Sequence, residues 1–388
     1  NISGSGFPGF VYHAGTHFND KRAWWPKAKP FINYLSRLSS VFQNTDFISD
    51  VLWYYGDKVP NSATPKNAHF SVGPGYDYEV INTDVLVNDL GVQDGKLVLS
   101  NGASFSMLAL EYEEAINPAV LIKLEELVKQ GALIVGEKPE EISQLVNTPL
   151  SQEGGKTLID QLWTNTADQG GKIFSGVTPL EMVSKLNVAP DFDYPDKDTF
   201  LLDFIHYRKN DLDFYFVANT SNEWVARECS FRVQNKLPEI WDAVSGKIIP
   251  VAIYEQDQQY TTIPITLAPY GSQLIAFSKA SPTSHYDRIT GDNQHPPLLE
   301  FTSDGFQLLE EGTIDLSGDN RSKVITNSVQ TKVLEGIWEL SFPDNWGAPD
   351  TIELPELTSW TESEIEGIRY FSGTATYEMK FQFEIESN

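Results

Sequence analysis

Three glutamates, Glu111, Glu113 and Glu114, follow directly after an apolar run at residues 106–110 that is typical of a strand. Carboxyl groups that gather at a strand end can serve as proton donor and base in a hydrolytic reaction. Acids in solvated loops are far commoner than catalytic carboxylates. We therefore interpret this group as part of a loop surface.

The sequence lacks the signatures of several other catalytic sites. It has no GxSxG motif, which argues against the nucleophile elbow of an α/β-hydrolase. It has neither HExxH nor clustered histidines, which argues against zinc hydrolysis. Residues 4–9 read GSGFPG and fit GxGxxG by letter, but no strand is expected before them and no helix after them. They are interpreted as a loop.

The single cysteine, Cys229, stands in the alternating segment ARECSFRV and is expected to be a small core residue. One cysteine excludes an internal disulfide framework and a zinc site built from several cysteines. Such low cysteine usage suits a periplasmic or secreted bacterial protein, and equally a cytosolic one.

The charge balance also restricts the possible partners. The chain has 28 Lys plus Arg against 54 Asp plus Glu, a net charge of -26. This excess repels phosphate backbones and anionic lipid, so nucleic acid and membrane surfaces are not expected partners. The acids are concentrated in residues 281–388. They are interpreted as a solvated surface, with calcium binding as the alternative.

The apolar pattern predicts how these residues are positioned. At residues 26–44 apolar side chains recur every three or four positions, which predicts a helix with one buried face. The apolar side chains of this face are Phe31, Ile32, Leu35, Leu38, Val41 and Phe42.

From residue 50 to about 190, short apolar runs alternate with helical patterns. The clearest helix has Asn117 as its N-cap, Pro118 at its first position and Gly131 just past its end. A strand, a crossover helix and a second apolar strand indicate a parallel sheet covered on both faces. We predict a flavodoxin-like α/β domain at residues 46–195. Its expected strands lie at residues 50–55, 96–100, 106–110, 132–136 and 172–176, and its later helices at 156–165 and 178–188.

From residue 196 the apolar pattern has a period of two and predicts an antiparallel β-sandwich at 196–280. Seven strands are expected, at residues 200–209, 212–221, 224–233, 236–243, 247–255, 259–267 and 272–279. The stretch at 280–297, rich in Pro, Ser, Gly and Asn, is interpreted as a linker, and residues 281–388 are taken as this linker together with a last β-domain. The alternating stretch at 371–388 is expected to form a strand that finds no partner before the chain ends. This suggests a piece of a larger multidomain enzyme.

Several segments in collinear order carry a resemblance to a known family. They read GTHFNDKRAWWPKAKPFINYLSRLSSVFQNTDFISDVLWYYGDKVPN, PGYDYEVINTDVLV, KLVLSNGASFSMLAL, DTFLLDFIHYRKNDLDFYFVANTS, PEIWDAVSGK and IRYFSGTATYEMKF. Together they resemble the C-terminal half of the α-L-rhamnosidases of glycoside hydrolase family 106. The resemblance implies that residues 1–45 are the last βα unit of a catalytic (β/α)8 barrel. It also implies that 281–388 contain a linker and a partial galactose-binding-like jelly roll.

The resemblance also implies a reaction and the place of its catalytic residues. The family uses two glutamates on barrel strands, in keeping with the two carboxyl groups that glycosidic cleavage requires. No Glu precedes Tyr55, so both are expected upstream of this chain and no catalytic residue is assigned in it. The expected function is part of a glycoside hydrolase that releases L-rhamnose from polysaccharide or glycoside, with the isolated chain inactive. The alternative is a noncatalytic carbohydrate-binding or scaffolding protein built from the same modules.

Within this framework the candidate substrate-binding residues are Thr16, His17, Asn19, Trp24 and Trp25, on a loop that follows an expected barrel strand. The indoles could stack on the C–H face of a sugar while His17 and Asn19 bind its hydroxyls. The alternatives are that the tryptophans fill a core or an interdomain contact and that His17 makes a structural hydrogen bond.

The expected partners are a carbohydrate containing L-rhamnose and the upstream barrel of the same polypeptide. The expected location is periplasmic or secreted, in a bacterium. The resemblance leaves a calcium cofactor open, but no loop of the DxDxDG type is present and no metal ligands are assigned.

Overall fold

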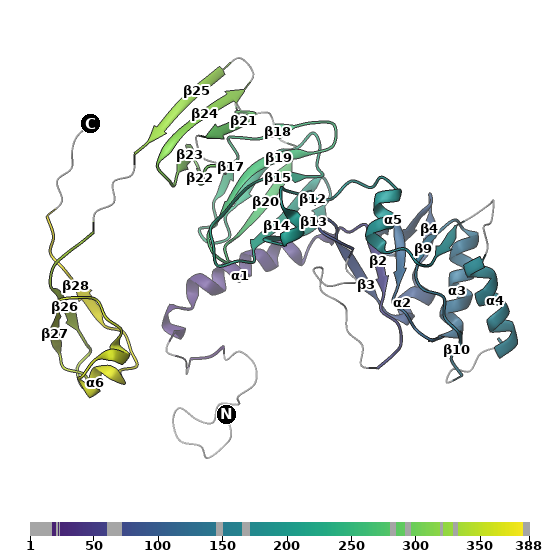
Figure 1. The fold of residues 1–388 in the computed structure, drawn as a ribbon, viewed down its shortest axis with the longest axis horizontal. Coiled ribbons are helices and arrows are strands. Elements are labelled where there is room, and N and C mark those ends of the chain that lie inside the picture. Colours follow the sequence, from purple (N-terminus) through teal and green to yellow (C-terminus); the bar gives the residue numbers. More distant parts are fainter. Residues whose placement is uncertain are drawn as a thin grey trace. The chain divides into compact units, whose positions relative to one another are not determined.

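The computed structural model describes residues 18–20, 22, 24–59, 72–144, 150–164, 171–279, 285–291, 296–318, 321–328 and 333–382. The chain divides into two compact units. One is Phe31–Ser328, and the other combines Asn1–Pro30 with Val329–Asn388. Figure 1 colours both along the sequence. None of the helices in the described ranges is long and apolar enough to cross a membrane.

A five-stranded parallel sheet forms one part of the larger unit (Figure 1). Two of its strands, β2 (Val51–Tyr54) and β7 (Met107–Leu110), are almost wholly buried, as the continuous apolar runs of the sequence predict. Numbered by their order in the chain, the strands lie in the order 2-1-3-4-5 when read from β3, which is the flavodoxin-like order. Across the sheet the strands are β11 (Lys172–Phe174), β9 (Leu133–Val135), β7 (Met107–Leu110), β2 (Val51–Tyr54) and β3 (Tyr78–Ile81).

Helices cover both faces of this sheet. Leu52, Leu108 and Ile134 point to one face and pack with α2, α3 and α4, while Val51 and Met107 point to the other and pack with α5. The helices are α2 (Thr83–Asn88), α3 (Pro118–Lys129), α4 (Gln152–Thr164) and α5 (Pro179–Lys185).

The predicted start of α3 is confirmed. The Asn117 side chain accepts a hydrogen bond from the backbone N–H of Ala119, and Pro118 is the first helical residue. Helix α5 begins with a capping box in which Thr178 and Glu181 satisfy each other's backbone N–H groups. Gly131 has a φ of +97°, as a glycine just past a helix end often does.

One strand expected in the parallel sheet lies elsewhere. Residues 96–98 do form a strand, β5 (Lys96–Val98), but it pairs antiparallel with β4 (Gly91–Gln93) and β6 (Ser104–Phe105). The turn at Asp94 and Gly95, both with positive φ, folds β5 back on β4 as a hairpin. A second small sheet, parallel, joins β8 (Ala115–Ile116) to β10 (Glu141–Ile142).

Two antiparallel sheets share one core next to this α/β part. Buried aromatic residues from both meet there, with the rings of Tyr215 and Phe231 centred 4.9 Å apart and those of Phe231 and Phe277 5.3 Å apart. One sheet has the order β1 (Asp46–Phe47), β13 (Leu202–Lys209), β14 (Leu212–Asn219), β20 (Ser272–Ser278), β16 (Leu237–Trp241), β17 (Ile248–Pro250). The other has the order β12 (Phe192–Asp193), β15 (Val225–Phe231), β19 (Thr261–Leu267), β18 (Glu255–Gln256).

All seven stretches predicted as strands between residues 200 and 279 contain one. The stretch 247–255 is not one continuous strand, because it contributes β17 to the first sheet and the start of β18 to the second. Pro250, which has no N–H to donate, ends β17. Strands β1 and β12 were not predicted; their residues fall within the predicted bounds of the α/β domain, but they pair with β13 and β15. Between β12 and β13 lies a 3-10 turn, η2 (Lys197–Thr199).

Helix α1 (Lys29–Phe42) lies against the outer face of the first sheet, after a 3-10 turn, η1 (Trp25–Lys27). Leu38 is buried there with Phe214, Leu274 and Ala276. The predicted apolar face is buried only in its second half. In its first half, exposed fractions reach 46% for Phe31, 37% for Ile32 and 39% for Leu35.

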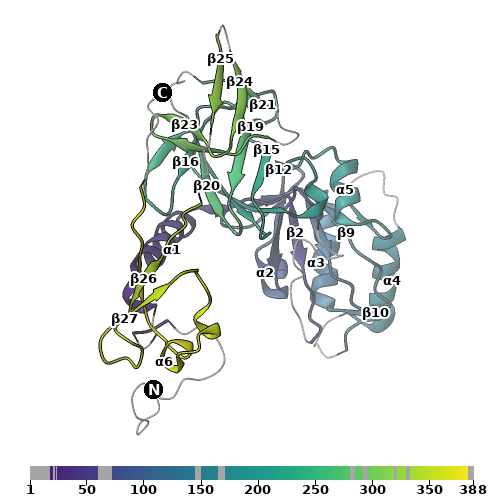
Figure 2. The same ribbon diagram turned by 60° about the vertical axis from the view of Figure 1, so that its left-hand side comes forward.

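The strands after residue 285 extend the same core. Ile289, Phe301, Ile314 and Leu316 belong to the cluster that the two sheets share. Figures 1 and 2 both show β24 and β25 projecting beyond those sheets. The strands are β21 (Arg288–Gly291), β22 (Leu299–Thr302), β23 (Gly305–Leu308), β24 (Gly312–Gly318) and β25 (Arg321–Asn327). The predicted domain boundaries at 195 and 280 stay predictions.

The described residues of the smaller unit include a three-stranded sheet with a small core around Leu340, Phe342 and Ile368. The expectation of a long unpaired last strand is wrong. Within the described part of this stretch β28 pairs antiparallel with β26. Helix α6, where Ile368 is buried, precedes the stretch. The elements are β26 (Trp338–Ser341), β27 (Thr351–Leu354), η3 (Trp360–Glu362), α6 (Glu366–Arg369) and β28 (Thr376–Glu378). The barrel unit and the partial jelly roll stay predictions.

Candidate functional site

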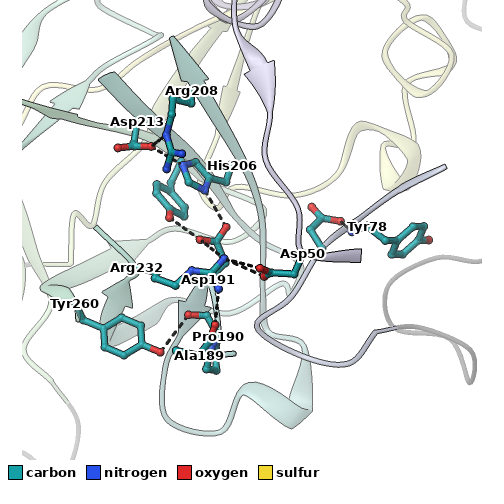
Figure 3. Close-up of polar contacts among 12 residues, drawn as sticks. Asp50, Tyr78, Ala189, Pro190, Asp191, His206, Arg208, Asp213, Arg232 and Tyr260 are labelled. Atoms are coloured by element: carbon teal, nitrogen blue, oxygen red, sulfur yellow. Dashed lines mark hydrogen bonds and ion pairs between the residues drawn. The ribbon is translucent and has the colours of Figure 1, made fainter. Parts of the chain in front are cut away.

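A polar cavity of about 740 Å³ lies in the larger unit where the α/β part meets the two antiparallel sheets. Its walls come from β1 and the residues up to Asp50, from β5 and the segment before β7, and from β13. A cluster of ionised side chains lines its floor, with Arg232 between Asp50 and Asp191 and with His206 beyond Asp191 (Figure 3).

The strand register brings this cluster together. Strands β13 and β14 form a hairpin around Asn210, whose φ is +53°, and this hairpin pairs His206 with Tyr215 and Arg208 with Asp213. The two rings of the first pair stack 4.0 Å apart. In the other sheet, the backbone N–H of Arg232 donates to the carbonyl of Asp191 at 3.0 Å.

His206 is almost completely buried and contacts two carboxylates. Its Nδ1 lies 2.9 Å from Asp191 Oδ2 and its Nε2 lies 3.0 Å from Asp213 Oδ1. Ionised carboxylates only accept hydrogen bonds, so both ring nitrogens must carry a proton. Burial alone would lower the pKa of His206, but the two carboxylates raise it, and the ring is an imidazolium.

Asp213 is the second anion beside this imidazolium. Besides His206, it accepts hydrogen bonds from Arg208 Nε at 2.6 Å and from Lys236 Nζ at 2.5 Å. Burial would raise the pKa of its carboxyl, but these three partners lower it far more. These partners hold the carboxyl of Asp213 in its ionised form.

Arg232 connects the α/β part to the sheets. Its Nη2 lies 2.9 Å and 3.1 Å from the two carboxylate oxygens of Asp50, and 3.3 Å from Asp191 Oδ1. Its Nη1 donates to the carbonyl of Ala189 at 2.7 Å. Burial raises the pKa of Asp50 and the guanidinium opposes that rise. For Asp191, burial is outweighed by His206, Arg232 and the Tyr215 hydroxyl, which lower its pKa.

This cluster is suited to holding charge in place. Each of its buried carboxylates binds at least one cation, so none is a protonated acid ready to donate to a substrate. Within the described ranges, no group of three or more His, Cys, Asp or Glu side chains could hold a metal ion. The cavity above the cluster can bind a polar molecule.

The residues predicted to bind substrate are only partly described. Thr16 and His17 lie outside the described residues. Asn19 is exposed, and Trp24 is 41% exposed with its ring 5.7 Å from Trp25 and 5.4 Å from Phe18, both edge to face. The structure thus brings Trp24 and Trp25 together with a third aromatic ring that the sequence analysis did not select.

Two of the three glutamates after β7 have side-chain contacts. Glu113 Oε1 accepts hydrogen bonds from the backbone N–H groups of Asp57 at 2.6 Å and Lys58 at 3.0 Å. Burial raises the pKa of Glu113. Glu111 forms an ion pair with Lys58 at 3.3 Å. The expectation of purely solvated acids is therefore incomplete, because Glu113 fixes the loop after β2. Cys229 is fully buried, as predicted.

The sequence analysis missed Asp191, His206, Asp213 and Arg232. A signal was present for two of them. In the alternating strands around the hairpin, His206 and Asp213 occupy positions that the period of two assigns to the buried face. A charged residue at such a position is rare unless it is paired.

Three matches to known proteins bear on the identity of the chain. The family model described as alpha-L-rhamnosidase, of glycoside hydrolase family 106, matches residues 4–256. A protein of Formosa agariphila named "Putative beta-glucuronidase" is 33% identical over 273 residues, which are 70% of this chain and 22% of that protein. The rhamnosidase structure from Novosphingobium sp. PP1Y matches with a TM-score of 0.68 and 25% identity, over 96% of this chain and 33% of that one.

The chain thus spans about a fifth of the first relative and a third of the second. The family model covers more than half of the chain, from the N-terminal region through the α/β part and into β18. The chain belongs to the α-L-rhamnosidase family, glycoside hydrolase family 106.

Proposed function

We propose that this chain is part of a glycoside hydrolase that releases L-rhamnose from polysaccharides or glycosides. The observation that carries the proposal is the match to the Novosphingobium rhamnosidase, which includes almost all of this chain but a third of that protein. The remaining two thirds would supply the barrel and its two catalytic glutamates. Residues 1–45 would then end that barrel.

The side-chain contacts support a noncatalytic role for the described residues. Glycosidic cleavage needs one carboxyl that donates a proton and a second one roughly 5 to 10 Å away. Asp50 and Glu113 have the raised pKa of a proton donor, and burial is the first cause in both. Asp50, however, binds a guanidinium through both oxygens, and one oxygen of Glu113 binds two backbone N–H groups.

In the complete enzyme, the aromatic group of Trp24, Trp25 and Phe18 would lie at the edge of the barrel and contact the sugar. Thr16, His17 and Asn19 would bind its hydroxyls. The exposure of Trp24 supports this, because an indole that stacks on a sugar must be open to it. We further propose a periplasmic or secreted location, where a polysaccharide substrate would be found.

The test compares the 388-residue chain with the full product of its gene on an aryl α-L-rhamnoside. The full protein should release the aryl group and the isolated chain should not. Release by the isolated chain, lost when one of its own acids is replaced by the amide, would refute the proposal. If the full protein binds rhamnosides without cleaving them, the alternative of a noncatalytic carbohydrate-binding protein holds.

A second substrate needs to be included in the same assay. The identity to the Formosa protein, 33%, is higher than the 25% to the rhamnosidase, and that protein is named a β-glucuronidase. An aryl β-glucuronide therefore tests a second candidate activity. If the full protein cleaves it and spares the rhamnoside, rhamnose release is the wrong activity.

A further inference from the structure

The cavity contains a cation with unused hydrogen-bond donors. Arg208, on β13, lines the cavity and uses its Nε to bind Asp213 at 2.6 Å. No residue in the described part of the chain pairs with its Nη1 or Nη2. The side chain is 45% exposed, so these two nitrogens can reach a ligand.

A second cation lines the same cavity from the α/β part. Lys96, the first residue of β5, is exposed and forms no ion pair with any residue that the structure describes. The other two cations on the cavity wall, His206 and Arg232, are already bound to buried carboxylates. Lys96 and Arg208 are therefore the two that remain available.

The wall carries a slight positive charge. Asp46 lies on the neighbouring strand β1 directly opposite Arg208, and no cation of the described chain lies within ion-pair distance of it. The negative charge of Asp46 weakens the attraction of the cavity for an anion but does not outweigh the cations. The wall has four cations, Lys96, His206, Arg208 and Arg232, and three acids, Asp46, Asp50 and Asp191. In a chain with a net charge of -26, such a cavity is exceptional.

The rest of the wall suits a sugar. Ser104, Ser106, Asn101 and Asn210 carry hydroxyl and amide groups. Hydroxyls and amides bind sugar hydroxyls. The volume of about 740 Å³ is within the range of small-ligand sites.

We propose that this cavity is a noncatalytic binding site for an acidic sugar, a uronic acid unit. Its carboxylate lies between the Arg208 guanidinium and the Lys96 ammonium, and its hydroxyls face the serines and asparagines. The planar fork of an arginine matches the two oxygens of a carboxylate. The site holds the sugar and does not cleave it. The proposal is independent of rhamnose release.

The test is calorimetric titration of the 388-residue chain with glucuronic acid at low salt. Lys96→Gln should weaken binding by about five- to tenfold, since it removes one exposed charge contact. Arg208→Gln should weaken it by about tenfold or more, because a paired guanidinium is lost. Asp46→Asn should strengthen it severalfold. Lys209→Gln, which changes the next residue on the same strand but lies outside the cavity, should leave it unchanged.

Three results would overturn the proposal. The first is the absence of binding to the unmodified chain. The second is equal affinity for L-rhamnose or galactose, which carry no carboxylate. The third is tighter binding of a sulfated galactose than of glucuronic acid, since this would assign the site to sulfate. Lys96→Gln breaks no ion pair within the described residues, so this variant is expected to keep the fold. Circular dichroism of each variant checks this.

Discussion

Replacing Arg232 with methionine tests whether the ion cluster holds the α/β part on the antiparallel sheets. The substitution preserves most of the apolar volume of the side chain and removes the guanidinium. It leaves Asp50 and Asp191 without this cation, at side-chain exposures of 11% and 2%. The carbonyl of Ala189 also loses its donor.

The size of the effect follows from burial. Removing one partner of a buried ion pair costs about 3–5 kcal/mol, because the remaining charge is left uncompensated. Asp191 keeps its hydrogen bonds with His206 and Tyr215, so most of the lost stability comes from the unpaired charge of Asp50. Asp50→Asn combined with Arg232→Met should recover part of the loss, because no unpaired charge then remains on Asp50.

The assay is hydrogen exchange followed by mass spectrometry across a urea series, because a chain of several parts has no single unfolding free energy. A loss of about 3–5 kcal/mol corresponds to a fall in protection of roughly 100-fold or more in β13 and β15. The matched control is Arg288→Met. Arg288 pairs with Glu255 at 3.8 Å with both side chains more than half exposed, and its loss should cost about 0–1 kcal/mol. Equal effects of the two substitutions would refute the reasoning.

Three further predictions concern pH, packing and substrate. The pKa of His206 is raised in the fold, so its contribution to stability is fully present below about pH 6.5 and is lost as the pH rises through the folded pKa. His206→Gln should therefore reduce the loss of stability at alkaline pH, measured as urea midpoints from pH 6 to 10. Gly171→Ala places a Cβ 1.8 Å from the Ala132 carbonyl oxygen and should lower the local stability of β9 and β11, read from hydrogen exchange, by at least about 2 kcal/mol, whereas Gly91→Ala, whose nearest neighbour is at 4.0 Å, should lower that of β4 by less than about 1 kcal/mol. Trp24→Ala in the full protein should lower kcat/KM on its glycoside by about 2- to 10-fold, and an unchanged value would exclude a stacking role.

Local pattern was sufficient to predict the strands and the principal helix. Strands β13 and β14 were predicted because apolar residues alternate along them with hardly an interruption. Helix α3 was predicted because its cap, its first proline and its closing glycine agree with its apolar pattern. In each case the information lies within about fifteen residues of chain.

The exceptions are elements whose partners are distant in sequence. Strand β5 has the composition of a core strand, but the turn before it pairs it with β4. Strand β12 is two residues long, and its identity depends on β15, more than thirty residues later. The first turns of α1 carry an apolar stripe that the described residues leave largely exposed. Periodicity identifies an apolar face but does not say what covers it.

The ion cluster shows the same limit at the level of a site. The hairpin register could have been inferred from sequence, and it places Arg208 opposite Asp213 and His206 two residues away. The link to Asp191, Arg232 and Asp50 depends on how two sheets and an α/β layer pack, which no local pattern specifies. Buried ion pairs contribute little net stability compared with well-packed apolar groups, but they penalise every arrangement that separates them. A cluster that requires three segments to meet is therefore suited to fixing one orientation between these layers, and the cavity above it keeps its shape because that orientation is fixed.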